Sequence, residues 1–223
     1  MLRKPSDREL TQQVLSELRW DSRLACTDIS VAVNEAVATL TGTVSSYARK
    51  TAAQEAAHRV AGVLDVANDI RVEPVDLFAR TDTEIAGGVR NALEWDALVP
   101  NELITSTVSD GWVTLEGDVD YWREREDAER AILRLSGVVG VINKIAIRKQ
   151  PVDPKELREQ IECALERRAD REAERLRLDI HDGAVDLWGR VHSWQEKRAV
   201  IGSIGHAPGV TRVVDHLRID PYF

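Results

Sequence analysis

The sequence predicts an α+β fold made of three tandem αββαβ units, each a three-stranded mixed sheet with two helices packed on one face. The first observation is a Leu-x-Gly-x-Val motif that occurs three times, with its glycine at Gly42, Gly117 and Gly189. These glycines are 75 and 72 residues apart, a regular period that indicates one supersecondary unit used three times. The second observation is a Gly-Val pair that begins 20 residues after each motif glycine, at Gly62, Gly137 and Gly209.

Each unit opens with a helical pattern, because apolar residues recur at four-residue steps. Capping residues precede each pattern: Ser6 in the first unit, Thr81 or Thr83 in the second, and Asp153 or Pro154 in the third. Trp20 and Trp95 end the first two helices, and we expect them to pack in the core. The apolar residues are Leu10, Val14 and Leu18, then Ile85, Val89 and Leu93, then Leu157, Ile161 and Leu165.

A hairpin follows each opening helix, since two runs of alternating apolar residues flank a short polar turn. Asp-Gly forms this turn in the second and third units, and the first unit has Asn34-Glu35-Ala36 instead. The first unit lacks the glycine but keeps Asn34, which tolerates positive φ better than most residues. The inward residues of the second strand are then Ala38, Leu40 and Val44, with Val113, Leu115 and Val119, and Val185, Leu187 and Val191.

The motif glycine falls in this inward register, where a missing side chain indicates either close packing of a helix or a bulge. A second helix follows, and the glycine of the Gly-Val pair is expected to end it as the C′ residue. A third strand begins at Val66, Val141 or Val213. A helical crossover leads into it, so it should run parallel to the second strand.

Composition excludes several classes of protein. The net charge is −8 and no unit is basic, which argues against a nucleic-acid partner. There is no transmembrane run and no secretory signal, so a cytoplasmic location is expected. Cys26 and Cys163 read as unpaired thiols.

The sequence predicts neither an enzyme nor a cofactor or metal site. Four of the five histidines lie in the third unit, but none has metal-ligand spacing. Acidic residues of the second helix of the middle unit, including Asp127, alternate with arginines as on a solvated helix face. No arrangement of nucleophile and base is recognisable. The histidines are His181, His192, His206 and His216.

Two sets of residues are candidates for binding. Trp112, Ile142 and Trp188 fall in the outward register of the sheets, where they would either pack between units or between copies of a homo-oligomer, or bind a ligand or partner. An aromatic residue also lies five positions after each motif glycine. It either anchors the junction between hairpin and helix or meets a lipid interface. These aromatic residues are Tyr47, Trp122 and Trp194.

The order of Gly-x-Val, Gly-Val and then Val-x-Asn-x-Ile-x-Val resembles the BON domain, a family named for bacterial osmotically inducible and nodulation-related proteins. The resemblance covers residues 6–74, 81–149 and 153–221, with Asp215 in place of the asparagine in the third copy. It implies a non-enzymatic domain that binds phospholipid surfaces, small ligands or proteins and serves in stress survival. Family members are usually periplasmic, which is the alternative location for this chain.

Two functions follow. The first is a stress-linked module that binds phospholipid or other envelope components. The second is a soluble cytoplasmic scaffold or sensor that holds a protein, a small molecule or a cation between its units.

Overall fold

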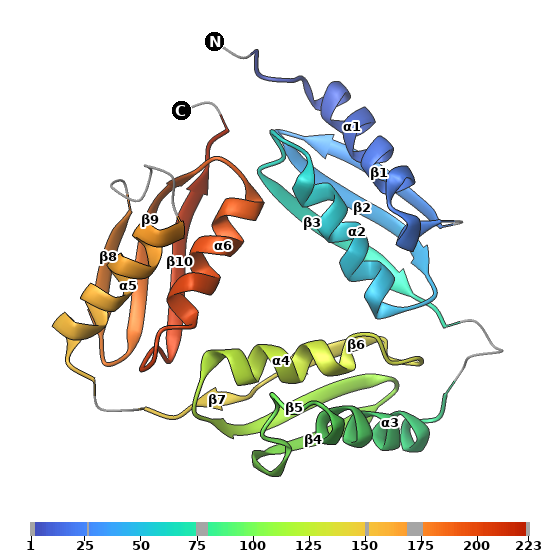
Figure 1. The fold of residues 1–223 in the computed structure, drawn as a ribbon. Coiled ribbons are helices and arrows are strands. Elements are labelled where there is room, and N and C mark those ends of the chain that lie inside the picture. The colour runs from blue at the N-terminus through green and yellow to red at the C-terminus, as the bar shows by residue number, and fades with distance from the viewer. Residues whose placement is uncertain (1–2, 26, 75–79, 150–151, 169–175, 222–223) are drawn as a thin grey trace.

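The computed structural model describes residues 3–25, 27–74, 80–149, 152–168 and 176–221, and Figure 1 shows three domains arranged in a ring. Each domain has the predicted order of helix, strand, strand, helix and strand, so the expected fold class is confirmed. In Figure 1 the helices lie in front of the strands of their own sheets. Of the two helices in each domain, the second lies nearer the centre of the ring.

The α-helices and strands of the three domains correspond one to one, apart from a break in the last strand of the second domain. The first domain contains α1 (Asp7–Trp20), η1 (Ser22–Leu24), β1 (Asp28–Asn34), β2 (Val37–Val44), α2 (Tyr47–Arg59) and β3 (Asp65–Val72). The second contains α3 (Asp82–Trp95), η3 (Asn101–Leu103), β4 (Ile104–Ser109), β5 (Trp112–Val119), α4 (Trp122–Ile132), β6 (Gly140–Asn143) and β7 (Ala146–Ile147). The third contains α5 (Pro154–Arg168), β8 (Arg177–His181), β9 (Ala184–Val191), α6 (Trp194–Gly205) and β10 (Arg212–Ile219).

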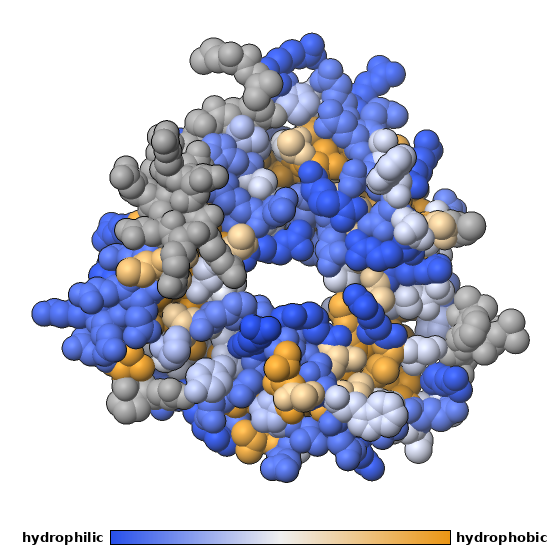
Figure 2. All heavy atoms as spheres, in the orientation of Figure 1, coloured by the Kyte–Doolittle hydropathy of each residue, from blue (hydrophilic) through white to orange (hydrophobic). Residues whose placement is uncertain are grey.

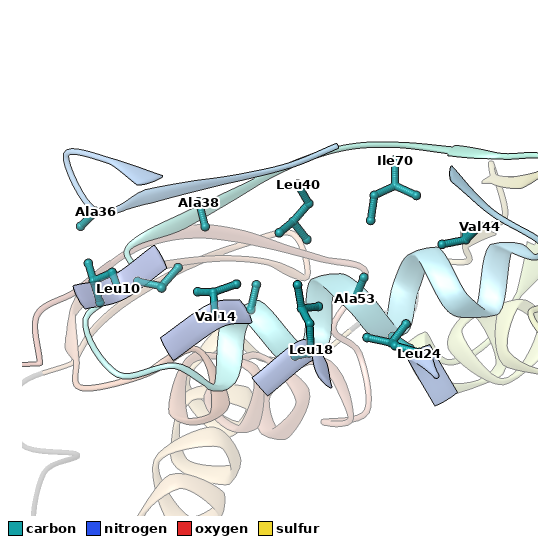
Figure 3. Close-up of a cluster of buried hydrophobic side chains, with 14 residues drawn as sticks. Leu10, Val14, Leu18, Leu24, Ala36, Ala38, Leu40, Val44, Ala53 and Ile70 are labelled. Atoms are coloured by element: carbon teal, nitrogen blue, oxygen red, sulfur yellow. The ribbon is translucent and has the colours of Figure 1, made fainter. Parts of the chain in front are cut away.

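The middle strand of each sheet pairs antiparallel with the first strand and parallel with the third, as predicted. In the first domain Leu40 therefore lies between Val31 on β1 and Asn68 on β3. The predicted inward residues of β2, β5 and β9 are all buried, and each domain has its own apolar core. Figure 3 shows this core in the first domain, between the sheet and the helices α1 and α2.

The starts of the first helices follow from their capping residues. Ser6 and Glu9 form a capping box at α1, and Thr81 forms one with Glu84 at α3, so Thr81 rather than Thr83 is the N-cap. In the third domain the carboxylate of Asp153 accepts a hydrogen bond from the backbone N–H of Lys155 at 2.8 Å. Pro154 then occupies the first helical position, where its missing N–H costs nothing.

The hairpin turn of the first domain lies within the predicted Asn34-Glu35-Ala36, but Asn34 does not have positive φ. The residues with positive φ are Glu35 (50°) and Ala36 (63°), whereas Asn34 belongs to β1. A two-residue turn between twisted strands needs positive φ at both central positions, and here these are the last two residues of the predicted turn. The carboxylate of Asp7 accepts hydrogen bonds from the N–H groups of Glu35 and Ala36, both at 3.0 Å.

The motif glycine makes room for the backbone at the start of the first strand. Neither expected reason applies at Gly42, because the nearest atoms belong to no helix and β1 pairs with β2 without a bulge. Gly42 has φ 132°, and a Cβ there would lie 2.2 Å from the carbonyl oxygen of Asp28, in β1. Gly117 has φ 147°, and its Cβ would lie 2.1 Å from the carbonyl oxygen of Leu103. The chain therefore uses glycine where the middle strand passes close to the backbone that begins its antiparallel neighbour.

The glycine of the Gly-Val pair does not end the second helix as predicted. The helix α2 ends at Arg59, and Gly62 follows in a separate turn closed by the N–H of Val63 on the carbonyl of Val60. Gly62 occupies the third position of this turn with φ 98°, a backbone conformation that favours glycine. The same turn occurs before β6 and β10, with Gly137 and Gly209.

The asparagine of the third strand joins that strand to the second helix. The side-chain NH₂ of Asn68 donates to the carbonyl of Lys50 at 3.1 Å, and its oxygen accepts from the N–H of Ile70 at 3.4 Å. In the third domain Asp215 takes this position and pairs with Lys197 Nζ at 2.6 Å. The replacement of asparagine by aspartate thus keeps the link between strand and helix.

Candidate binding surfaces

The recurring aromatic residues lie at the contacts between domains. Each begins the second helix of its domain and is half-buried. Tyr47 packs against the apolar core of the second domain, Trp122 lies against Gly205 of the third, and Trp194 stacks on His58 of the first. The same position thus links each domain to the next around the ring. Figure 2 shows an opening at its centre, surrounded mostly by hydrophilic side chains.

The junction between the first and third domains is an aromatic stack. The rings of His58 and Trp194 are 4.0 Å apart between centroids and 17° from parallel, and Lys197 Nζ lies 5.0 Å from the centroid of the indole ring. Burial lowers the pKa of His58 to about 4, and the positive charge of Arg198 adds to this effect. His58 is therefore neutral at physiological pH and presents an uncharged ring to the indole.

The junction between the second and third domains combines an aromatic contact with polar ones. A Cβ on Gly205 would lie 3.0 Å from the ring of Trp122, so the glycine lets the indole approach α6. Trp122 Nε1 donates to Glu126 Oε1 at 3.0 Å. The other oxygen of Glu126 lies 3.5 Å from His206 Nε2 of the third domain.

The junction between the first and second domains is formed by Tyr47. Burial raises the pKa of its phenol, and the nearby carboxylate of Glu129 in the second domain raises it further. Tyr47 therefore stays neutral and uses its ring as an apolar contact.

Two of the three outward residues of the sheets are more accessible than these aromatics, and the third, Trp188, is not. Trp112 is 46 % exposed and Ile142 is 43 % exposed. The ring of Trp112 covers Gly140, where an added Cβ would lie 2.4 Å from it. Trp188 is half-buried between Arg177, 5.6 Å from the indole, and His216, whose ring stacks on it at 5.0 Å.

Two other tryptophans are far more exposed, contrary to expectation. Trp20 is 86 % exposed and Trp95 is 85 % exposed, so neither packs in a core. They occupy corresponding positions, 22 residues before Gly42 and Gly117. In each helix only the apolar stripe that ends at Leu18 or Leu93 is buried against the sheet. The tryptophan two residues later therefore stays in solvent.

The prediction of a solvated face on α4 was wrong at Asp127, which is only 5 % exposed. Its carboxylate forms ion pairs with Arg123 and Arg130, and it lines a cleft of about 360 Å³ between the second and third domains. The corresponding residues of the other domains are Ala52 and Ala199. Comparing the three repeats position by position would have singled out Asp127.

The histidines of the third domain form pairs with single carboxylates. His181 lies 3.2 Å from Asp179, and His216 lies 3.3 Å from Asp186. Within the residues that the structure describes, no three His, Cys, Asp or Glu side chains form a group that could hold a metal ion. In the same part of the chain, no helix has the length and apolar character needed to cross a membrane.

The repeated fold and the junctions between its units define a modular protein with three homologous domains. The BON domain family matches residues 6–74, 81–149 and 153–221, so the chain belongs to this family. It is 31 % identical to osmotically-inducible protein Y of Escherichia coli (strain K12) over 144 residues, which are 62 % of this chain and 71 % of that protein.

A second relative is an uncharacterized protein encoded in the gshII 5′ region of Anaplasma centrale. It is 33 % identical over 122 residues, which are 52 % of this chain and 81 % of the relative. Among solved structures, CdsD, a structural protein of the type III secretion system of Chlamydia trachomatis, has 11 % identity. Its TM-score is 0.28, and the match covers 95 % of this chain and 92 % of CdsD.

Proposed function

We propose that this protein is a non-enzymatic, osmotic-stress-linked module that docks on phospholipid surfaces. Membership of the BON family and the likeness to an osmotically inducible protein support the link to stress. The observation that carries lipid docking is the nearly complete exposure of Trp20 and Trp95 at corresponding ends of α1 and α3. In Figure 1 these two helices lie on the same side of the ring, in front of their sheets.

An exposed indole is suited to a lipid interface, because its ring is apolar while its N–H can bond to headgroups or water. Trp95 is accompanied by two exposed leucines, Leu98 and Leu103, in the segment that follows α3. Two such sites on one chain would act together, since the second would bind at a high effective concentration. We therefore assign Trp20 and Trp95 to lipid docking and Trp112 with Ile142 to a separate surface.

The test is flotation of the protein with liposomes made from zwitterionic lipid alone or with added anionic lipid. The wild-type protein is expected to float with the vesicles, and the double variant W20S/W95S is expected to stay in solution. The matched control is W112S, which removes a partly exposed indole from the sheet face and should float normally. Failure of the wild type to float with either lipid would remove the proposal.

A second candidate function is a sensor or scaffold that holds a small molecule between its domains, in either the cytoplasm or the periplasm. The observation that favours it is a cleft of about 810 Å³ formed by residues of the first and third domains. Thermal-shift measurements with anions and cations test this function, and the absence of any shift would count against it.

A further inference from the structure

The cleft between the first and third domains carries an unusual charge for this protein. Its lining includes three basic side chains, Lys4, Arg190 and Arg218, and one carboxylate, Asp220. The whole chain has a net charge of −8. A locally positive cleft on an acidic protein attracts anions by its own field, and the low-dielectric walls strengthen that field.

Two of the three cations are available to a ligand. Arg190 Nη1 lies 3.6 Å from Asp220 Oδ2, so its charge is partly compensated. Lys4 and Arg218 make no hydrogen bond or ion pair with any residue that the structure describes. Lys4 comes from the first domain and Arg218 from β10 of the third, so an anion held by both would join the two domains.

The remaining lining is apolar or backbone. Leu64, Ile219 and Pro221 contribute apolar surface, and Gly62 and Gly189 contribute no side chain. The volume of about 810 Å³ exceeds that of an inorganic anion and is in the range of small-molecule sites. The guanidinium group of an arginine matches the geometry of a phosphate, which it can bind with two parallel hydrogen bonds.

We propose that this cleft binds a small organic phosphate, whose phosphate groups contact Lys4 and Arg218 while its carbon skeleton lies against Leu64 and Ile219. The proposal names the ligand class for the second candidate function and does not depend on lipid docking. The first and third domains are not consecutive in the chain. A phosphate bound between them would therefore stabilise the closed ring at the junction where His58 meets Trp194.

The experiment is isothermal titration of the full-length protein with inorganic phosphate, pyrophosphate and fructose 1,6-bisphosphate at low ionic strength. The bisphosphate is expected to bind more tightly than inorganic phosphate. Each of R218Q and K4Q should weaken its binding by about tenfold, since each removes one charge-assisted contact. The matched control is R71Q, because Arg71 occupies the position of Arg218 in the first domain and does not line the cleft. It should bind as the wild type does.

The proposal is overturned if none of the three phosphates binds, or if R71Q weakens binding as much as R218Q. A lipid headgroup is the other source of phosphate, so the same variants are floated with vesicles containing phosphatidylglycerol. R218Q should float like the wild type. If R218Q loses vesicle binding but keeps its affinity for the bisphosphate, the assignment to a small molecule is wrong. The lipid-docking proposal is tested separately, by flotation of the wild type and of W20S/W95S. Its failure can therefore be distinguished from failure of the phosphate proposal.

Discussion

The imidazole of His58 lies parallel to the indole of Trp194, with 4.0 Å between the ring centroids, and this stack joins the first domain to the third. The pKa of His58 is lowered to about 4 from its ordinary value of 6.5. Burial is the main cause. Arg198 and Lys197 lower the pKa further, while Asp65 and Glu55 oppose them. The closed junction therefore disfavours the protonated ring.

The ring is expected to open as the pH falls. Above pH 6.5 His58 is neutral whether the junction is open or closed, and closure is fully stabilised. Between pH 6.5 and about 4 an open junction takes up a proton that the closed one refuses, so closure weakens progressively. Small-angle X-ray scattering should show the radius of gyration increasing over this range.

The variant H58F supplies the control for this prediction. Phenylalanine keeps an aromatic ring against Trp194 but cannot take up a proton. The radius of gyration of H58F should then stay constant between pH 7 and 4.5. An identical expansion of H58F and the wild type would show that another group drives the opening.

Replacing a motif glycine should unfold part of its domain. In G117A the new Cβ would meet the carbonyl oxygen of Leu103, and the left-handed backbone alone costs about 1–3 kcal/mol. By contrast, Gly87 lies in α3, and a Cβ added there would have no atom within 4 Å. G87A should therefore stabilise the helix by about 0.5–1 kcal/mol. Hydrogen exchange of peptides from β4 and β5 measures both effects. Equal exchange in G117A and the wild type would refute the steric explanation.

The carboxylate that caps the hairpin turn should matter for stability. D7A removes the acceptor for the N–H groups of Glu35 and Ala36, and D82A does the same for Asp110 and Gly111. Each loss should cost about 1–3 kcal/mol, because two donors lose a charged acceptor. Faster hydrogen exchange in the affected hairpin is the readout. D69A, an exposed change on β3, should leave it unchanged.

The link between third strand and second helix should tolerate aspartate better than an apolar residue. N68L leaves the carbonyl of Lys50 without its donor and should destabilise the first domain by about 1–3 kcal/mol. N68D should cost less, because Lys50 occupies the position from which Lys197 pairs with Asp215. Hydrogen exchange of α2 and β3 distinguishes the two variants. If N68D proves more damaging than N68L, the lysine does not compensate.

Local features of the fold were predictable because they follow from short-range rules. The alternation of apolar residues correctly predicted that Leu40 lies in the core, and the capping-type residue Ser6 marked the start of α1. The two residues of positive φ within the first hairpin turn, Glu35 and Ala36, were not singled out because no glycine marks them. The position of this turn depends on Asp7, which is distant in the sequence.

The binding surfaces were less predictable, because exposure depends on how the domains meet. Tyr47 and Trp20 are both aromatic residues at helix ends, and nothing local distinguishes them. One is covered by the neighbouring domain and the other by nothing that the structure describes. Whether Trp112, Ile142 and Trp188 bind a partner stays a prediction.

The ring has a consequence for self-association. Every junction joins an aromatic residue at the start of one second helix to the next domain, so the contacts run head to tail and close after three steps. If the stack of Trp194 on His58 separates, one molecule exposes both complementary halves of a joint. A second copy can then occupy each half, and the same contact that seals a monomer becomes the bond of a growing chain. Closure of the ring within one chain would thus compete with head-to-tail association between copies.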